Sequence, residues 1–225
     1  MAVSFLDNLK KQADNLRTHH GVSTAALEAR IEETEQACQL AFKYWLDLAK
    51  QLNVLQPPCV GRYLFDNKVV IEQPPFSHFR ADLRKRSWGG RDVTDHAVLF
   101  GEARTGRTVS LTKNFPIDIE KLEARLTQSG VQCTPEPVRN PDTGKLIEVR
   151  YEFLADVLVS ARLRPLHEEA KVEFTVDNVD GLIRWVVEFD SREVDSALLD
   201  EMAKWLVGHP HQFTQRGKVL HLRES

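Results

Sequence analysis

The sequence predicts an α+β protein, in which an N-terminal α-helical hairpin precedes a mainly antiparallel β-sheet body with two further helices. Helix-forming residues dominate as far as Gln56, whereas β-branched residues, aromatic residues, prolines and glycines dominate after Pro57-Pro58. Apolar residues recur at helical spacing before this boundary and mostly at alternate positions after it. We therefore divide the chain into residues 1–56, the helical hairpin, and 57–225, the sheet and its helices.

The composition is that of an ordinary globular protein. The chain has 225 residues, with 30 Lys and Arg against 33 Asp and Glu, so its formal net charge is −3. Nucleic-acid binding by the molecule as a whole is not favoured at this charge and would need a local basic patch. The chain has no long apolar run, its N-terminal residues soon become charged, and its three cysteines are far apart. We therefore expect a cytoplasmic protein with no membrane association and no cofactor.

One apolar stripe in the N-terminal part has the spacing of a coiled coil. Its eight positions are four and three residues apart in turn, so they stay on one side of a helix for about seven turns. The stripe consists of Leu27, Ile31, Thr34, Cys38, Ala41, Trp45, Leu48 and Leu52. Such a stripe must be covered by another helix or by the body of the protein, which indicates packing or assembly rather than chemistry.

The segment before this stripe is predicted to fold back against it. Gly21 can end a first helix, and Ser23 or Thr24 can cap a second one. The first helix has an apolar seam of its own, made of Leu6, Leu9, Ala13 and Leu16. An antiparallel pair of helices would bring this seam against the stripe. The alternative is one continuous coiled-coil helix.

The end of the second helix would extend beyond the first. Apolar residues surround most of its circumference from Phe42 onward, which is typical of a segment that is buried on more than one side. Either the β-sheet body or a second subunit must cover it. If a subunit does, the protein is a dimer or larger, and the candidate interface residues are Phe42, Trp45, Leu48 and Leu52.

The first half of the body, residues 60–130, begins with a predicted β-hairpin about Asp66-Asn67. It ends with a helix in which Leu122 and Leu126 recur at helical spacing and which Gly130 closes. The predicted strands are residues 60–65, 69–71, 79–88, 93–101 and 107–112. Residues 132–145, which contain three prolines, are predicted to form a loop.

The second half of the body, residues 145–225, begins with the longest predicted strand. Every odd position from Val149 to Leu163 is apolar, and the length of this run predicts a bend or bulge within it. Later elements are a hairpin of residues 170–176 and 183–189, a helix between a capping box at residues 190–193 and Gly208, and a strand at 219–222. Since the order strand, strand, strand, helix occurs in both halves, the body is a candidate duplicated β-β-β-α unit.

The strongest candidate binding site is the basic segment of residues 78–91. Read as a strand, it places three arginines and a tryptophan on one outer face. Guanidinium groups at two-residue intervals can contact successive phosphates, and an exposed indole can stack on a base. The candidate nucleic-acid-binding residues are Arg80, Arg84, Arg86, Trp88 and Arg91. The alternative is a solvated strand face whose charges protect a sheet edge or pair with Asp82 and Asp92.

The segment Glu169-Ala170-Lys171 resembles the Glu-x-Lys part of the metal site in nucleases related to restriction endonucleases. In that family an upstream aspartate completes the site, and Asp156 is available here. The resemblance implies a metal-dependent hydrolase. The expected strand pairing argues against it, because Asp156 would lie opposite Asp177, roughly 23 Å along the sheet from Glu169. Ligands of one ion must all lie within a few ångströms of it.

Three histidines near the end of the chain, His209, His211 and His221, are candidate zinc ligands. No acidic or sulfur-bearing residue nearby completes the set, and His209 follows a helix C-terminus, where the helix dipole alone favours an imidazolium. The sequence therefore assigns no metal ligand and no catalytic residue.

These observations predict a non-enzymatic binding or adaptor protein that acts through a protein partner or through self-association. The alternative is a nucleic-acid-binding protein that uses the basic strand. The third possible function is that of a metal-dependent hydrolase or nuclease.

Overall fold

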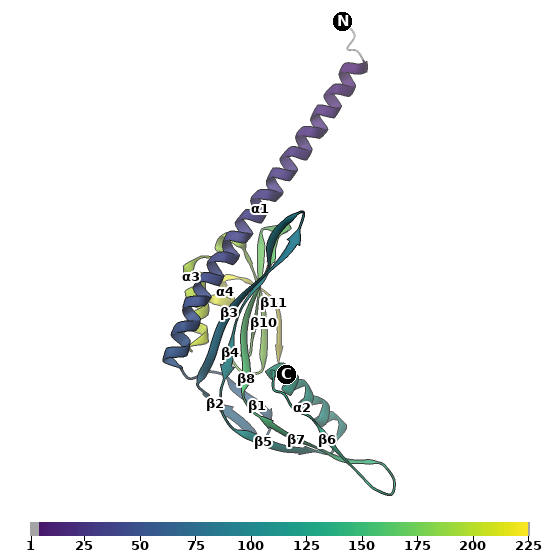
Figure 1. Cartoon of the computed structure of the whole chain (residues 1–225), viewed down its shortest axis with the longest axis vertical. Helices are drawn as coiled ribbons and strands as arrows, with labels where there is room; N and C mark the ends of the chain where they lie inside the picture. The colour runs from purple at the N-terminus through teal and green to yellow at the C-terminus, as the bar shows by residue number, and fades with distance from the viewer. Residues whose placement is uncertain (1–4, 225) are drawn as a thin grey trace.

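The computed structural model describes residues 5–224, with side chains described for residues 24–222 (Figure 1). One long helix, α1 (Phe5–Leu55), leads into a body of antiparallel strands and shorter helices. The predicted α+β class and the mainly antiparallel sheet are confirmed. Among the described helices, none is both long and apolar enough to cross a membrane.

The strands form three antiparallel sheets. The six-stranded sheet has the order β11-β10-β9-β8-β4-β3, the three-stranded sheet has the order β5-β7-β6, and β1 pairs with β2. The strands are β1 (Arg62–Asp66), β2 (Val69–Glu72), β3 (Phe76–Trp88), β4 (Arg91–Ala103), β5 (Thr108–Lys113), β6 (Glu136–Arg139), β7 (Leu146–Leu154), β8 (Val157–Leu166), β9 (Lys171–Asp177), β10 (Ile183–Asp190) and β11 (Lys218–Glu224).

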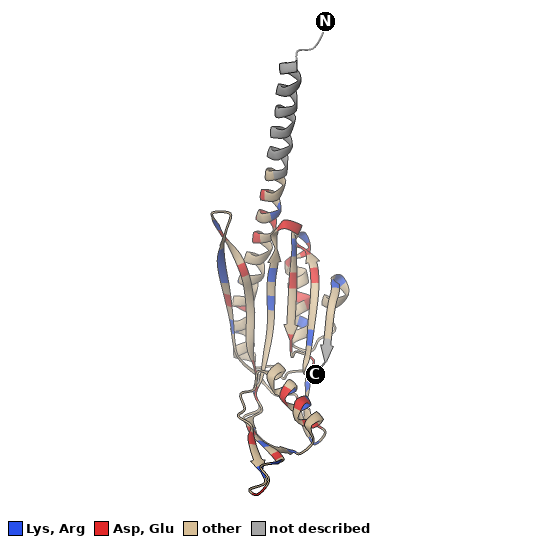
Figure 2. Cartoon of the chain, turned by 90° about the vertical axis from the view of Figure 1, so that its right-hand side faces the viewer, with Lys and Arg blue, Asp and Glu red and all other residues tan. Residues whose placement is uncertain are grey.

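The remaining helical elements are α2 (Pro116–Ser129), α3 (Ser196–Leu206), α4 (Phe213–Arg216) and the 3₁₀ turns η1 (His167–Glu169) and η2 (Ser191–Glu193). α1, α3 and α4 lie on one face of the six-stranded sheet, and α2 lies at one end of the opposite face (Figure 1). Figure 2 shows the sheet from that opposite side, with basic and acidic residues scattered along its strands. We call it the open face, because α2 is the only described helix on it.

The predicted helical hairpin is not confirmed, because α1 runs without a break through Gly21. A glycine within a helix costs only about 1 kcal/mol relative to alanine. The stripe needs no second helix, since the inner face of the six-stranded sheet covers it. Most of its positions from Ile31 to Leu52 are buried, and only Leu48 in that range is half-buried. The pairing predicted for the seam of the first helix lies outside the described side chains.

Trp45 is the central contact between α1 and the sheet. Its side chain is 0% exposed, and its ring meets that of Phe174 on β9 edge to face, with centroids 6.1 Å apart. Phe174 in turn contacts Phe189 and Phe213 at 5.6 and 5.4 Å. This aromatic cluster joins α1, the middle of the sheet and α4 into one core.

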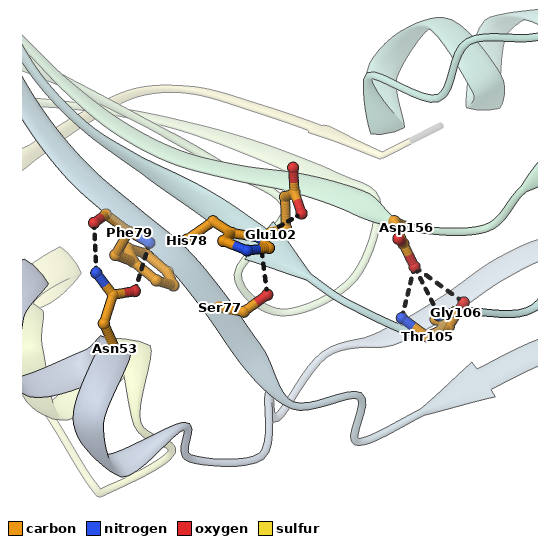
Figure 3. A network of polar contacts seen from close by, with 8 residues as sticks. All are labelled: Asn53, Ser77, His78, Phe79, Glu102, Thr105, Gly106 and Asp156. Carbon is orange, nitrogen blue, oxygen red and sulfur yellow. Dashed lines mark hydrogen bonds and ion pairs between the residues drawn. The ribbon is translucent and has the colours of Figure 1, made fainter.

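The predicted long strand is two strands, β7 and β8, which belong to different sheets. All the odd positions from Val149 to Leu163 are buried, as the alternation predicts. The chain bends between the strands at Asp156, whose Oδ1 accepts hydrogen bonds from the backbone N–H of Thr105 (2.6 Å) and of Gly106 (2.9 Å) (Figure 3). The bend is therefore fixed to the loop between β4 and β5.

Two local predictions are corrected. β6 lies within the predicted loop of residues 132–145, where Pro137 is tolerated because β6 is an edge strand. The capping box of Asp190 and Glu193 is present, but it belongs to η2. α3 has its own N-cap, Asp195, which accepts a hydrogen bond from the backbone N–H of Leu198 at 2.7 Å.

The candidate duplication is not confirmed. In the first half, β3 and β4 belong to the six-stranded sheet and β5 to the three-stranded sheet. In the second half, β8, β9 and β10 all belong to the six-stranded sheet. The same order of elements along the chain is thus folded in two different ways.

One amide ties the end of α1 to the edge strand β3. The pairing of β3 with β4 is irregular between Ser77 and Arg80, and His78 between them has a positive φ of 56°. The backbone of Phe79 pairs instead with Asn53 (Figure 3). Phe79 N–H donates to Asn53 Oδ1 and Asn53 Nδ2 donates to Phe79 O, each at 2.7 Å.

Replacing Asn53 with leucine is expected to destabilise the fold by about 1–3 kcal/mol, because two partly buried backbone groups lose their partner. Urea unfolding followed by far-UV circular dichroism measures this cost. Gln51→Leu is the matched control, since Gln51 is exposed in the same turn of α1 and should change stability by less than about 0.5 kcal/mol. Equal effects of the two changes would refute the role given to Asn53.

Candidate functional site

The basic segment predicted from the sequence is β3 together with its turn into β4. All four of its candidate arginines are exposed, and Trp88 is half-buried. Three of the arginines contact their own chain. Arg80 lies 4.6 Å from the ring centroid of Phe100, Arg84 Nε donates to Asp82 at 2.9 Å, and Arg86 lies 3.7 Å from Asp95. Much of the positive charge is therefore already paired within the molecule.

Arg86 and Trp88 come together with a second segment of the chain at a pocket of about 300 Å³. The second segment is the end of β8 and the turn η1. We call this cavity the Trp88 pocket, and its lining residues are Arg86, Trp88, Arg164, Pro165, Leu166, His167, Glu168 and Glu169. Arg80, Arg84 and Arg91 lie outside this lining.

Trp88 rests on a buried histidine. The rings of Trp88 and His167 have centroids 5.5 Å apart and are tilted by 32°. His167 is buried, and its Nε2 lies 2.7 Å from Glu35 Oε1 on α1. Its Nδ1 is buried without a hydrogen-bond partner among the described residues. The histidine thus joins the wall of the pocket to α1.

The carboxylate of Glu35 fixes three elements at once. Besides contacting His167, it accepts hydrogen bonds from the backbone N–H of Thr94 at 2.8 Å and from the Thr94 hydroxyl at 2.9 Å. Thr94 lies on β4 and is buried. α1, β4 and η1 therefore meet at one side chain, which sets the position of the ring under Trp88.

The charges that line the pocket balance. Arg164 donates two hydrogen bonds to Glu173, at 3.2 and 3.0 Å, so its guanidinium is held in place. The Arg86 guanidinium lies 5.9 Å from the centroid of the Trp88 ring. Glu168 and Glu169 supply two exposed carboxylates on the η1 side. The lining thus holds two guanidinium groups that are paired with carboxylates outside it, two exposed carboxylates and an indole.

The four candidate interface residues differ in accessibility. Trp45 and Leu52 are buried by the chain's own sheet, so they leave no surface for a second subunit in this fold. Phe42 and Leu48 are half-buried. The part of α1 that the sequence predicts as a subunit interface is therefore covered largely by the chain's own sheet.

The residues that resemble a nuclease site do not meet. Asp156 precedes β8 and Glu169 follows it, so about ten residues of strand, roughly 33 Å, separate them. Lys171 forms an ion pair with Glu188 at 2.9 Å. These groups cannot hold one metal ion together.

The three C-terminal histidines also lie in different settings. His211 stacks on Trp205 with ring centroids 5.0 Å apart, His209 is exposed after α3, and His221 is exposed on β11. Within residues 24–222, no group of three or more histidine, cysteine or acidic side chains is placed to hold a metal ion.

None of the three thiols is activated. Burial raises the pKa of the Cys38, Cys59 and Cys133 thiols above the usual value. The thiolate is the nucleophilic form of cysteine, so a raised pKa disfavours a catalytic role.

Sequence reasoning identified Arg86 and Trp88 but missed Glu35, Arg164 and His167. Glu35 and His167 are 132 residues apart in the chain, and no motif connects them. The sequence contains one weak signal, since Glu35 lies beside Thr34 of the buried stripe and thus close to the body.

Comparison of this chain with protein-family models, with curated proteins and with solved structures found no match.

Proposed function

We propose that this protein is a non-enzymatic binding protein, and that the Trp88 pocket receives a segment of a protein partner. The observation that supports this most is the mixed charge of the pocket, in which Arg86 and Arg164 lie with Glu168 and Glu169 around an indole. A polypeptide offers side chains of both signs and apolar groups that pack on an aromatic ring. Nucleic acid offers a row of phosphates, which two carboxylates in the same pocket would repel.

The pocket is also rigidly supported. Trp88 packs on His167, His167 is held by Glu35, and Arg164 is held by Glu173. Side chains that are fixed before binding lose little conformational entropy when a ligand arrives. Such support is typical of a binding site and needs no chemistry at the site.

The open face of the six-stranded sheet extends the surface next to the pocket. Arg162 on β8 is exposed and lies opposite Val98 on β4 and Thr175 on β9. Arg162 and Arg164 are two positions apart in one strand, so they face the same side. An extended segment that leaves the pocket can follow this face (Figure 2).

A random peptide library displayed on phage, selected on the full-length chain, tests this proposal. We expect the selected peptides to bind Trp88→Ala about thirtyfold more weakly, since the loss of an aromatic anchor costs about 2 kcal/mol. Phe115→Ala is the control, because Phe115 is exposed and does not line the pocket. Selection of no peptide, or equal binding by the native chain and Trp88→Ala, would show that the pocket is not the binding site.

A nucleic-acid-binding function is the second candidate. It is favoured by Lys85 and Arg91, which are exposed on the same hairpin and form no ion pair within residues 24–222. A fluorescent single-stranded oligonucleotide in the same binding assay separates the two functions. Nucleic-acid binding would weaken steeply with salt and would be lost in the double variant Lys85→Ala, Arg91→Ala, which leaves the lining of the Trp88 pocket intact.

A further inference from the structure

We infer that the edge strand β11 pairs with β11 of a second copy of this chain, in antiparallel register about a two-fold axis. This inference is independent of the proposed function, because the Trp88 pocket is formed by other strands. The proposed partner of β11 is the same strand in an identical chain.

The two edges of the six-stranded sheet differ in their protection. β3, at one edge, carries a run of charged side chains, Arg80, Asp82, Arg84, Lys85 and Arg86, and α1 is tied to it through Asn53. Charged residues and a covering helix are among the means by which proteins prevent edge strands from pairing with other chains. This edge is therefore protected.

β11, at the other edge, has mainly apolar exposed side chains. Val219 is 43% exposed, Leu220 is 43% exposed and Leu222 is 48% exposed. Leu220 is the extra residue of a β-bulge and has no partner position on β10. An edge strand with unpaired backbone groups and exposed apolar side chains is a template for strand addition.

The sequence of β11 complements itself when it is paired antiparallel about His221. Position 220 then faces position 222, so a leucine meets a leucine on both sides of the axis. Position 219, a valine, faces position 223, an arginine, and position 218, a lysine, faces position 224, a glutamate. Apolar pairs and opposite charges directly across two strands are each stabilising, and the two-fold axis makes every such pair occur twice.

The neighbouring register is poorer. A pair centred on position 222 would set histidine 221 against arginine 223 and leucine 220 against glutamate 224. Neither pair is favourable, because one joins two basic residues and the other desolvates a carboxylate beside a leucine. The sequence therefore favours the register centred on His221 over the register centred on position 222.

Sedimentation velocity over a dilution series of the full-length chain tests the inference. A single pair of edge strands is a small interface, so we expect a dimer that dissociates on dilution. Leu220→Lys and Leu222→Glu should each raise the dissociation constant about tenfold or more, because each sets a charge against a leucine. Leu158→Lys, on β8 of the open face, is the matched control, since Leu158 is also exposed and should leave the dimer unchanged.

Mixing the two variants gives the sharpest test. In the register centred on His221, a Leu220→Lys chain and a Leu222→Glu chain bring opposite charges together at one pair and keep two leucines at the other. The mixture should therefore form a heterodimer more tightly than either variant forms a homodimer. Thermal unfolding of each variant verifies that it is folded. A native chain that is monomeric throughout, a dimer insensitive to Leu220→Lys, or a mixture without recovery would each overturn the inference.

Discussion

Replacing Trp45 with alanine is expected to destabilise the protein by about 3–5 kcal/mol, the largest effect of any single change considered. The side chain is fully buried, and its ring packs on Phe174 at the centre of the core. Its removal leaves a cavity that joins α1, β9 and α4, which the surrounding rings can fill only in part. Urea unfolding followed by circular dichroism measures the loss.

Two further substitutions, one at Trp45 and one at its neighbour Leu46, test whether the loss of stability comes from the packing of the Trp45 ring. Trp45→Phe keeps an aromatic ring and removes an indole N–H that has no hydrogen-bond partner among the described residues, so it should cost less than half as much. Leu46→Ala alters an exposed neighbour and should cost less than about 1 kcal/mol. If Trp45 instead lay at a subunit interface, Trp45→Ala would dissociate an oligomer and leave the monomer as stable as before.

Replacing Glu35 with alanine is expected to have the second largest effect, about 2–4 kcal/mol. The change removes the acceptor for two groups of buried Thr94 and the partner of His167 Nε2, and each buried polar group left without a partner costs about 1–3 kcal/mol. The same change frees the ring beneath Trp88. Binding of a selected peptide should therefore weaken even at temperatures where the variant remains folded.

Glu35→Gln and Glu32→Ala are the controls for this prediction. The glutamine keeps one acceptor oxygen for Thr94, so its loss of stability should be intermediate. Glu32 is an exposed residue on α1 that pairs with Gln36, and its loss should be nearly neutral. Should Glu35→Ala and Glu32→Ala behave alike, Glu35 would not hold the three elements together.

Much of the fold follows from local patterns in the sequence. The alternation from Val149 to Leu163 predicts which residues are buried, and Gly130 ends α2 in the left-handed conformation, as expected. The stripe correctly predicts the buried side of the helix between Ile31 and Leu52. Each of these features depends on residues that are close in the chain.

Local patterns show which face of an element is buried, but they do not show which other element covers that face. The stripe has the same spacing whether a helix or a sheet covers it, so the spacing alone does not distinguish a helical hairpin from the continuous helix α1. The run from Val149 to Leu163 is equally regular whether it forms one strand or two. The bend between β7 and β8 is marked by hydrogen bonds of Ala155 and Asp156 to a loop that is distant in the chain.

The candidate site could be predicted only in part, because some of its residues are close in the chain and others are far apart. Arg86 and Trp88 stand out because they lie in one short basic segment. Arg164 and His167 line the same pocket only because β8 ends beside the hairpin of β3 and β4, and Glu35 contributes through α1. A pocket that is lined by two distant segments and supported by a third has no local motif.

Hydrogen exchange of the full-length chain, with and without a peptide selected from the library, is the most direct test of the central claim that the Trp88 pocket binds a partner segment. The peptide should slow exchange of the backbone amides at residues 85–91 and 164–170 and leave residues 42–52 and 218–224 unchanged. Slowed exchange in either of the latter segments, without any change around the pocket, would contradict the claim and place the binding surface elsewhere.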